Sequence, residues 1–190
     1  MLPNQWTFNH IYEFRIVESL KKDPSFQGLI DILGGAPPLD KMLSEEEKSN
    51  HDRLRSAETG VRFRLGVYCG SELIAFTYAF QIEGSNLHMA MSCVHPAHRR
   101  KGIYKELIRA TIQFSKDSGF QTVDSYHRST NNSVIIAKLQ NGFVINGMTL
   151  SDLMGCLVRL TYFHNSERRK LQEVRSGMIR PDALLRELFF

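Results

Sequence analysis

The chain has 190 residues, of which 42% are apolar and 23% are charged, with a formal net charge of +4. This length supports one buried core, and this composition excludes wholesale disorder. The mild positive charge favours an anionic ligand such as a phosphorylated cofactor. It does not require nucleic acid, whose binders usually concentrate their charge on one face.

The cysteines and the apolar runs bear on the compartment and on metal binding. The three cysteines are widely spaced, without a CxxC pair or a histidine at metal-ligand spacing, so we expect no metal and a reducing, cytoplasmic environment. The first residues lack the uninterrupted apolar stretch of a secretory signal. No apolar run approaches the roughly 20 residues of a membrane-spanning helix, so we expect no membrane partner.

The first 60 residues read as a helical extension. Near-helical spacing connects the apolar residues Phe8, Ile11, Tyr12, Ile16 and Leu20. A highly charged stretch, Glu45 to Arg55, indicates a second, solvated helix. The cluster Gly34, Gly35, Pro37 and Pro38 separates the two.

From Val61 the pattern changes to the alternation of a strand, with Phe63, Leu65 and Val67 on one face. Turn residues separate this strand from two further runs, Leu73 to Ile82 and Leu87 to Val94. The sequence therefore predicts three antiparallel strands in a meander.

After Pro96 and Gly102 the apolar residues recur with a helical period, at Ile103, Leu107, Ala110 and Phe114. This period predicts one amphipathic helix. The helix is expected to end at Ser118-Gly119, where a glycine can take the left-handed conformation of a C-cap. Phe120 to His127 then reads as a fourth strand. A strand, a helix and a strand in this order make a crossover unit.

The remainder contains one ambiguous segment, residues 131–141. Its β-branched residues favour a strand, its asparagines and its glycine favour a capped helix, and the Asn-Gly pair is also typical of a hairpin turn. Phe143 to Leu150 and Cys156 to Phe163 read as a terminal hairpin, so the sheet is mixed. Residues 164–190 read as a basic helix with an apolar end, which we expect to pack on the same single domain.

The segment most informative about function is VHPAHRRKGIYKEL, residues 94–107. Here a strand ends and a short basic loop leads through Gly102 into a helix. The first N–H groups of a helix have no intrahelical acceptor and carry the positive end of its dipole, so they attract phosphate. Gly102 permits close approach, and Arg99, Arg100 and Lys101 add attraction. The alternative is a basic turn before an ordinary helix.

This segment resembles the coenzyme A motif of the GNAT N-acetyltransferase superfamily, a Q/R-x-x-G-x-G/A pattern that follows a strand ending in V-x-P. Arg99 and Gly102 match the motif, and Val94 and Pro96 stand at the expected places. Tyr104 departs from it, because the family usually has Gly or Ala there. That side chain either crowds the pyrophosphate or packs beside it.

A second segment, NNSVIIAKLQNGF, resembles another motif of the superfamily, with Asn131, Gly142 and Phe143 in register and Gly119 at the expected distance before it. The resemblance favours a helix for the ambiguous segment and covers roughly residues 63–163. It implies an α/β fold of GNAT type, with a mixed, mostly antiparallel twisted sheet flanked by helices and a core of residues 61–163. It also implies acetyl-CoA as cosubstrate, bound by Ser92, Cys93, Val94, Arg99, Arg100, Lys101, Gly102, Ile103, Tyr104 and Asn131.

The resemblance also guides the search for catalytic residues. Lys138 stands where the superfamily often has a tyrosine that protonates the leaving thiolate. It could donate a proton if desolvation lowers its pKa, and the alternative is a solvated surface lysine. His127 titrates near neutral pH and is the first candidate for a base, unless it simply bonds a loop carbonyl. Glu83 is a weaker base candidate, and Cys93 is a core residue or, alternatively, the nucleophile of a ping-pong mechanism.

We therefore expect an acetyl-CoA-dependent N-acetyltransferase that acylates a primary amine by direct attack in a ternary complex. The acceptor is a small-molecule or peptide amine, and a homodimer is left open. One alternative is a catalytically silent module that binds coenzyme A as a sensor or a partner-docking domain. A second alternative is a nucleic-acid binder, which is disfavoured because the basic clusters lack interleaved aromatic residues.

Overall fold

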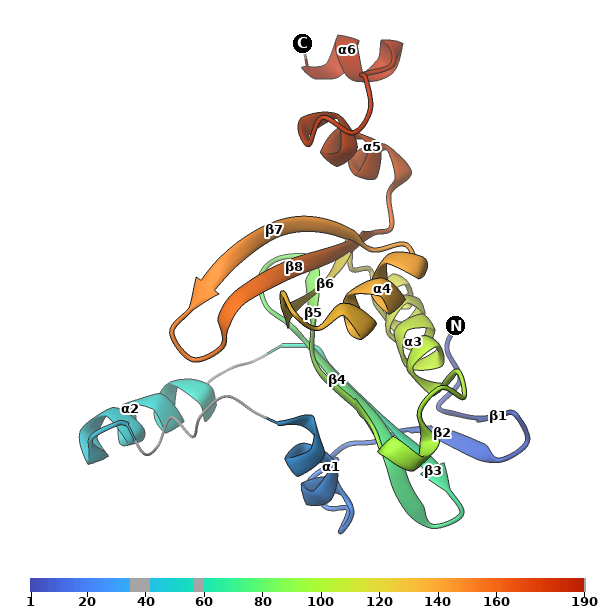
Figure 1. Ribbon diagram of the computed structural model, residues 1–190, viewed down its shortest axis with the longest axis vertical. Helices are drawn as coiled ribbons and strands as arrows, with labels where there is room; N and C mark the ends of the chain where they lie inside the picture. Colours follow the sequence, from blue (N-terminus) through green and yellow to red (C-terminus); the bar gives the residue numbers. More distant parts are fainter. Residues whose placement is uncertain (35–41, 57–59, 190) are drawn as a thin grey trace.

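The computed structural model describes residues 1–34, 42–56 and 60–189. Within these residues the strands form one eight-stranded sheet in the order β1-β2-β3-β4-β5-β6-β8-β7, and only the β5–β6 pair is parallel. The strands are β1 Gln5–Phe8, β2 Tyr12–Ile16, β3 Arg62–Cys69, β4 Glu72–Gln81, β5 Asn86–Val94, β6 Thr122–Arg128, β7 Val144–Ser151 and β8 Gly155–Phe163. The predicted mixed, mostly antiparallel sheet is confirmed (Figure 1).

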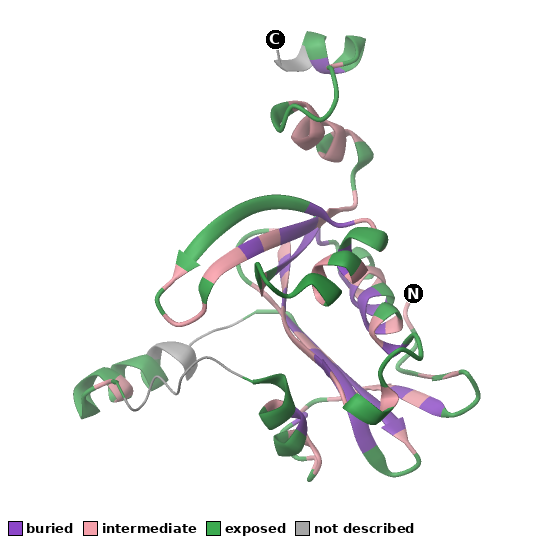
Figure 2. Cartoon of the chain, viewed as in Figure 1, coloured by how far each residue is buried: buried purple, intermediate pink, exposed green. Residues whose placement is uncertain are grey.

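The helices are α1 Phe26–Leu33, α2 Glu45–Ser56, α3 Ile103–Asp117, α4 Asn132–Gln140, α5 Ser166–Arg175 and α6 Ala183–Phe189. Helix α3 packs across β3 to β6 on one face of the sheet, whereas α1 packs on β4 and β5 on the other face. Apolar side chains fill both layers, and the purple positions in Figure 2 follow the central strands and the inner side of α3. The sheet therefore has an α3 face and an α1 face.

The first segment corrects the expected helical extension. Residues 5–16 form the antiparallel hairpin β1–β2, with Phe8 opposite Tyr12, and β2 pairs with β3. Asn9 and His10 turn the chain with positive φ values of 52° and 58°. The charged helix does form, as α2. Of the Gly-Pro cluster, only Gly34 lies within the described residues.

A notch opens between β5 and β6. Their parallel pairing covers only Asn86 to His88 against Thr122 to Asp124, after which the strands part. On the other side of β5 the register with β4 slips between the pairs Tyr78–Met91 and Ala79–Met89, so Ala90 is an extra residue. A bulge of this kind bends a strand and strengthens its twist. The bulge therefore lies in the part of β5 that turns away from β6.

The ambiguous segment is helical, as the resemblance indicates, and α4 contacts β7. Helices α5 and α6 follow the C-terminal end of β8 and lie away from the turn of the β7–β8 hairpin (Figure 1). Leu185 of α6 is nevertheless only 1% exposed, so this residue of the apolar tail is buried. None of the described helices combines the length and the apolar character needed to cross a lipid bilayer.

Candidate active site

The loop between β5 and α3 presents free backbone donors. A 3-10 turn, Pro96–His98, ends with the Arg99 N–H bonded to the Pro96 carbonyl, and Glu106 N–H bonds the Gly102 carbonyl. Between these two bonds, no N–H of residues 100–105 donates to another group of the described chain. Arg100 and Gly102 have positive φ values of 62° and 83°, which bends successive N–H groups toward a common side. The result is a concave anion site at a helix N-terminus.

Gly102 is required here for two reasons. Its φ of 83° is unfavourable for residues with a side chain, and a Cβ at this position would lie 3.2 Å from Cζ of Phe8. The hairpin β1–β2 therefore packs directly on the loop. The indole Nε1 of Trp6 also donates to Glu106 Oε1 at 2.9 Å, which ties the hairpin to the first turn of α3.

A cavity of about 440 Å³ lies beside this loop and reaches α1 and α4. Nine of the ten residues predicted for the cofactor line it: Ser92, Cys93, Val94, Arg99, Arg100, Gly102, Ile103, Tyr104 and Asn131. Lys101 does not. The sequence did not point to the other lining residues, which are Ile32, Leu33, His98, Lys105, Ser133, Val134 and Ala137. The spacing of the last three with Asn131 places them along one side of α4, which could have been recognised once the segment was assigned as a helix.

Tyr104, the departure from the motif, packs against the core and leaves the cavity open. Burial raises the pKa of its phenol, so the hydroxyl stays protonated. Cys93 is 5% exposed, and burial likewise raises the pKa of its thiol, although Arg99 opposes the shift. A neutral buried thiol is a poor nucleophile, which disfavours the ping-pong alternative.

Lys138 is fully buried under α4, so the alternative of a solvated lysine is wrong. Its Nζ lies 2.8 Å from Sδ of Met89, the first residue of β5 past the parallel pairing, and 4.2 Å from the centre of the Phe143 ring. Desolvation lowers the pKa of Lys138 to about 7, against a smaller opposite effect of Asp124. An ionisable amine is thus buried beside Met89 at the start of the notch, with a pKa suited to proton transfer at neutral pH.

His127 lies on β6, with Nε2 3.0 Å from Oγ of Ser125. The expectation that it titrates near neutral pH is wrong. Desolvation first, and then the charges of Lys138 and His88, lower the pKa of His127 to about 4. A neutral histidine of this kind is a weak base at pH 7.

Glu83 is not brought to the notch. It is exposed in the turn between β4 and β5. That turn precedes Asn86, the start of β5, whereas the cavity is lined by Ser92 to Val94 at the other end of the strand.

A second cavity, of about 500 Å³, lies on the α1 face of the sheet. Its lining contains charges of both signs and apolar groups: Glu18, Ser19, Leu20, Lys21, Phe26, Asp52, Arg62, Arg64, Tyr78 and Met91. Met91 is followed in β5 by Ser92, which lines the first cavity. The two cavities therefore approach each other at the part of β5 that borders the notch.

Three solved structures with a similar fold are described as acetyltransferases. The ribosomal-protein-S5-alanine acetyltransferase of Vibrio fischeri is 14% identical, with 85% of this chain and 97% of that chain covered and a TM-score of 0.64. The ribosomal-protein-S18-alanine N-acetyltransferase of Escherichia coli is 15% identical, covers 80% and 94%, and has a TM-score of 0.60. A Bacillus subtilis acetyltransferase in complex with CoA is 16% identical, covers 80% and 98%, and has a TM-score of 0.56. At these identities the likeness shows the fold.

No curated protein matches the chain in sequence. The model of the Acetyltransferase (GNAT) family matches residues 26–143, which is more than half of the chain and contains the loop, the notch and α4. This chain belongs to the GNAT family of acetyltransferases.

Proposed function

We propose that the protein is an N-acetyltransferase that transfers an acetyl group from acetyl-CoA to a primary amine by direct attack in a ternary complex. Acetyl-CoA is the cofactor of the GNAT family, and its thioester supplies the activated acetyl group when bound. The observation that carries the proposal is the approach of two cavities at one strand. The first has the anion site, and the second is free to hold an acceptor.

The residues of the first cavity fit this cofactor. The free N–H groups of residues 100–105 and the guanidinium groups of Arg99 and Arg100 complement a diphosphate. From Met89 onward, the edge of β5 that faces the notch has no partner strand. Its backbone groups can therefore bond a pantetheine amide. The diphosphate and the arm thus have separate sites in one cavity.

Lys138 is the proposed proton donor to the departing sulfur. The chain places its Nζ at the start of the notch, and a donor with a pKa of about 7 is populated as an ammonium at neutral pH. His127 stays neutral and holds Ser125 beside it. Cys93 needs no covalent role, because the acceptor nitrogen attacks directly.

The proposed acceptor is a small-molecule or peptide amine. The second cavity has acidic groups, Glu18 and Asp52, to bind an ammonium, and basic groups, among them Lys21, to bind an anionic part of the same molecule. Structural neighbours are described as acting on the alanine of ribosomal proteins or on spermidine. Peptide N-termini and polyamines are therefore the first acceptors to test.

The test combines calorimetric titration of acetyl-CoA with an assay of free-thiol release over a panel of spermidine, lysine and peptides that begin with alanine. We expect saturable binding and thiol release that requires one of the amines. Absence of acetyl-CoA binding would refute the proposal. Binding without thiol release on any amine would favour the silent coenzyme A-binding module, which Lys138 at the usual tyrosine position keeps as the second candidate.

A further inference from the structure

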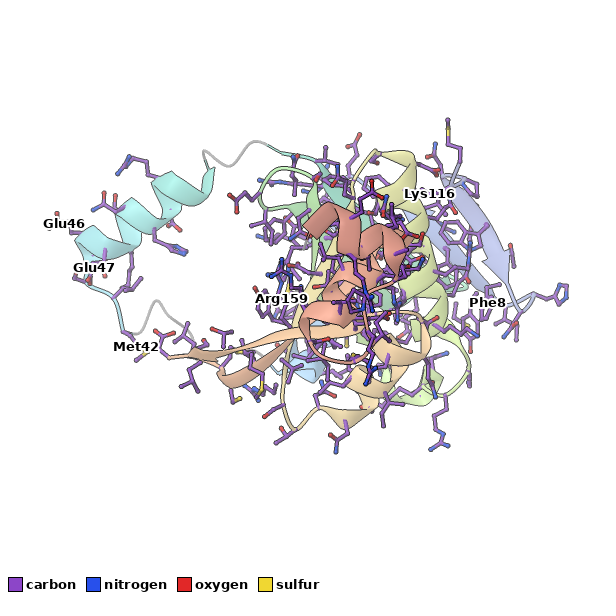
Figure 3. All side chains as sticks on the ribbon, turned by 90° about the horizontal axis from the view of Figure 1, so that it is seen from above. Phe8, Met42, Glu46, Glu47, Lys116 and Arg159 are labelled. Carbon is purple, nitrogen blue, oxygen red and sulfur yellow. The ribbon has the colours of Figure 1, made fainter. Side chains whose placement is uncertain are left out.

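A buried polar cluster joins β5, β6 and β8 on the α1 face of the sheet, and the chemistry proposed so far does not use it. Asp124 is 1% exposed at its centre. Its Oδ1 is 2.7 Å from Nδ1 of His88. Its Oδ2 accepts from Asn86 Nδ2 at 2.9 Å and from Arg159 Nε and Nη2 at 3.0 and 2.7 Å. Figure 3 places Arg159 on the side of the core that faces α2, opposite Phe8 and Lys116.

These contacts fix the protonation state of the cluster. Burial alone would raise the pKa of Asp124, but hydrogen bonds from His88 and Asn86 and the charges of His88 and Arg159 lower it below its usual value. The ionised carboxylate can only accept, so Nδ1 of His88 carries the hydrogen. The lone pair of a neutral His88 is then on Nε2, and no described residue bonds that atom. The side chain is 15% exposed, and Nε2 is not among the fully buried polar atoms that lack a partner in the described chain, so a ligand or water can reach it.

His88 also lies at a decisive place in the sheet. His88 and Asp124 form the last parallel pair before β5 and β6 part. The next residue, Met89, projects to the α3 face and contacts Lys138. Successive side chains of a strand point to opposite faces, so Lys138 and His88 approach the start of the notch from its two sides.

The α1 face connects His88 with the second cavity. Phe80 lies directly opposite His88 in the β4–β5 ladder, and their ring centres are 5.6 Å apart. The ring of Tyr78, which lines the second cavity, is 5.6 Å from Phe80. The ring of Tyr126 closes the other side of His88, also at 5.6 Å. His88 therefore belongs to the face from which an acceptor in that cavity would enter the notch.

We propose that His88, oriented by Asp124, is the general base that removes a proton from the acceptor amine. This inference rests on the proposed acetyltransferase function and adds a catalytic residue to it. Asp124 acts through His88 and is a positioning residue. Asn86 and Arg159 hold Asp124 in place.

The protons and electrons balance in this scheme. Nε2 of His88 takes one proton from the acceptor ammonium. The freed nitrogen forms a bond to the acetyl carbon, and the carbon–sulfur bond breaks with its electron pair on sulfur. Lys138 protonates the sulfur and recovers a proton from the new amide nitrogen. His88 releases its proton to solvent, so an ammonium and a thioester give an amide, a thiol and one proton.

The groups that face His88 determine the expected pH dependence. They are Phe80 from β4, Asp124 and Tyr126 from β6 and Arg159 from β8, of which Asp124 and Arg159 are charged. His127, whose pKa is lowered in part by the charge of His88, is neutral above about pH 4. In this scheme His88 is the base on this face, so its replacement should change the pH dependence of kcat/KM.

The test is His88→Asn, because the amide nitrogen of asparagine can replace Nδ1–H toward Asp124 but cannot act as a base. We expect acetyl-CoA affinity to be unchanged and kcat with the best amine to fall about 100-fold or more at pH 7. The deficit should shrink toward pH 10, where the acceptor amine loses its proton without help. His10→Asn, at an exposed turn, is the matched control and should keep wild-type kinetics.

The inference is overturned if His88→Asn keeps wild-type turnover, or if its deficit is the same at every pH. If His88→Asn does not fold, His88→Gln and Asp124→Asn provide the same readout, and an unchanged turnover and pH profile in both overturns the inference as well. A wild-type protein that releases no thiol with any amine instead refutes the proposed function itself, before His88 is tested.

Discussion

Lys138 is the residue in which stability and chemistry conflict most. A buried ammonium must find compensation, yet its closest contacts are a thioether and an aromatic ring. Such contacts are weak relative to the hydration that the charge gives up. The fold therefore tolerates a destabilising group, and the proton-transfer role that we propose for Lys138 would account for a lysine at this position.

Replacing Lys138 by methionine separates these two roles. Methionine keeps the length of the side chain and removes the charge, so we expect the free energy of unfolding to rise by about 1–4 kcal/mol at pH 7. The kcat should fall about 100-fold, because the departing sulfur loses its proton donor. Urea unfolding and the thiol-release assay measure the two effects, and Lys138→Tyr, which restores the tyrosine usual in the family, should recover part of the activity.

The difference in the free energy of unfolding between Lys138→Met and the wild type should change with pH in a definite direction. The pKa of Lys138 is about 7 in the folded chain and near its ordinary value of 10.5 in the unfolded chain. Between these values the unfolded chain binds more protons, so Lys138 makes the wild type more stable as pH rises from about 7 to about 10.5. The stability advantage of the methionine variant should therefore shrink over this window. A difference that is constant from pH 6 to pH 10 would contradict the low pKa.

The sequence could not reveal these residue properties. The motif placed Lys138 at a catalytic position, but a lysine on a short helix is usually solvated, and only the contact with Met89 of β5 shows that it is buried. His127 was selected for the ordinary pKa of histidine, and its low value arises from burial and from charges on other elements. Both corrections depend on the long-range environment of one side chain.

Among the elements, the hairpin β1–β2 has a clear structural role. It lies before residue 26, where the family match begins, and supports the cofactor loop from outside. Phe8 covers Gly102, Trp6 bonds Glu106, and the Tyr12 hydroxyl is 3.2 Å from Nδ1 of His98, which lines the cofactor cavity. The hairpin thus holds both ends of the loop that presents the free N–H groups.

Truncating Phe8 tests this support. We expect Phe8→Ala to leave an uncovered gap beside Gly102, to loosen the loop and to raise the Kd for acetyl-CoA about 5-fold, which corresponds to about 1 kcal/mol. Ile11→Ala is the matched control, because Ile11 is 60% exposed at the tip of the same hairpin. Calorimetric titration of both variants measures the effect, and equal affinities for the two would remove the hairpin from cofactor binding.

The hairpin was also the element that the sequence predicted incorrectly. Phe8, Ile11, Tyr12 and Ile16 fit a helical spacing, but Tyr12, Phe14 and Ile16 also alternate as in a strand. Asn9, which tolerates a left-handed conformation, was the turn signal that should have favoured the strands. The strands from β3 to β8 were predicted to within a few residues, because their alternation is longer and turn residues separate them.

For the molecule as a whole, the two sides of the notch differ in how far the sequence could predict them. The cofactor loop is one contiguous segment, so spacing and the motif identified nine lining residues. The cluster around Asp124 joins residues 36 and 35 positions apart on three strands. No local pattern marks such a set, and only the sheet order brings its members together.

The C-terminal helices complete the molecule that we propose to be a single domain. Leu185 of α6 is 1% exposed and lines a cavity together with Leu171 of α5 and Phe120, which lies between α3 and β6. Its burial means that α6 contributes to the stability of the fold.

Leu185→Ala should lower the free energy of unfolding by about 2–4 kcal/mol, as a buried leucine that loses its methyl groups leaves a cavity. Leu184→Ala, at a neighbouring position that is 47% exposed, should change it by less than about 0.5 kcal/mol. Thermal and urea unfolding measure both values. One transition, shifted as a whole by Leu185→Ala, is expected for a tail that belongs to the core, whereas a separate early transition would show that α5 and α6 unfold independently.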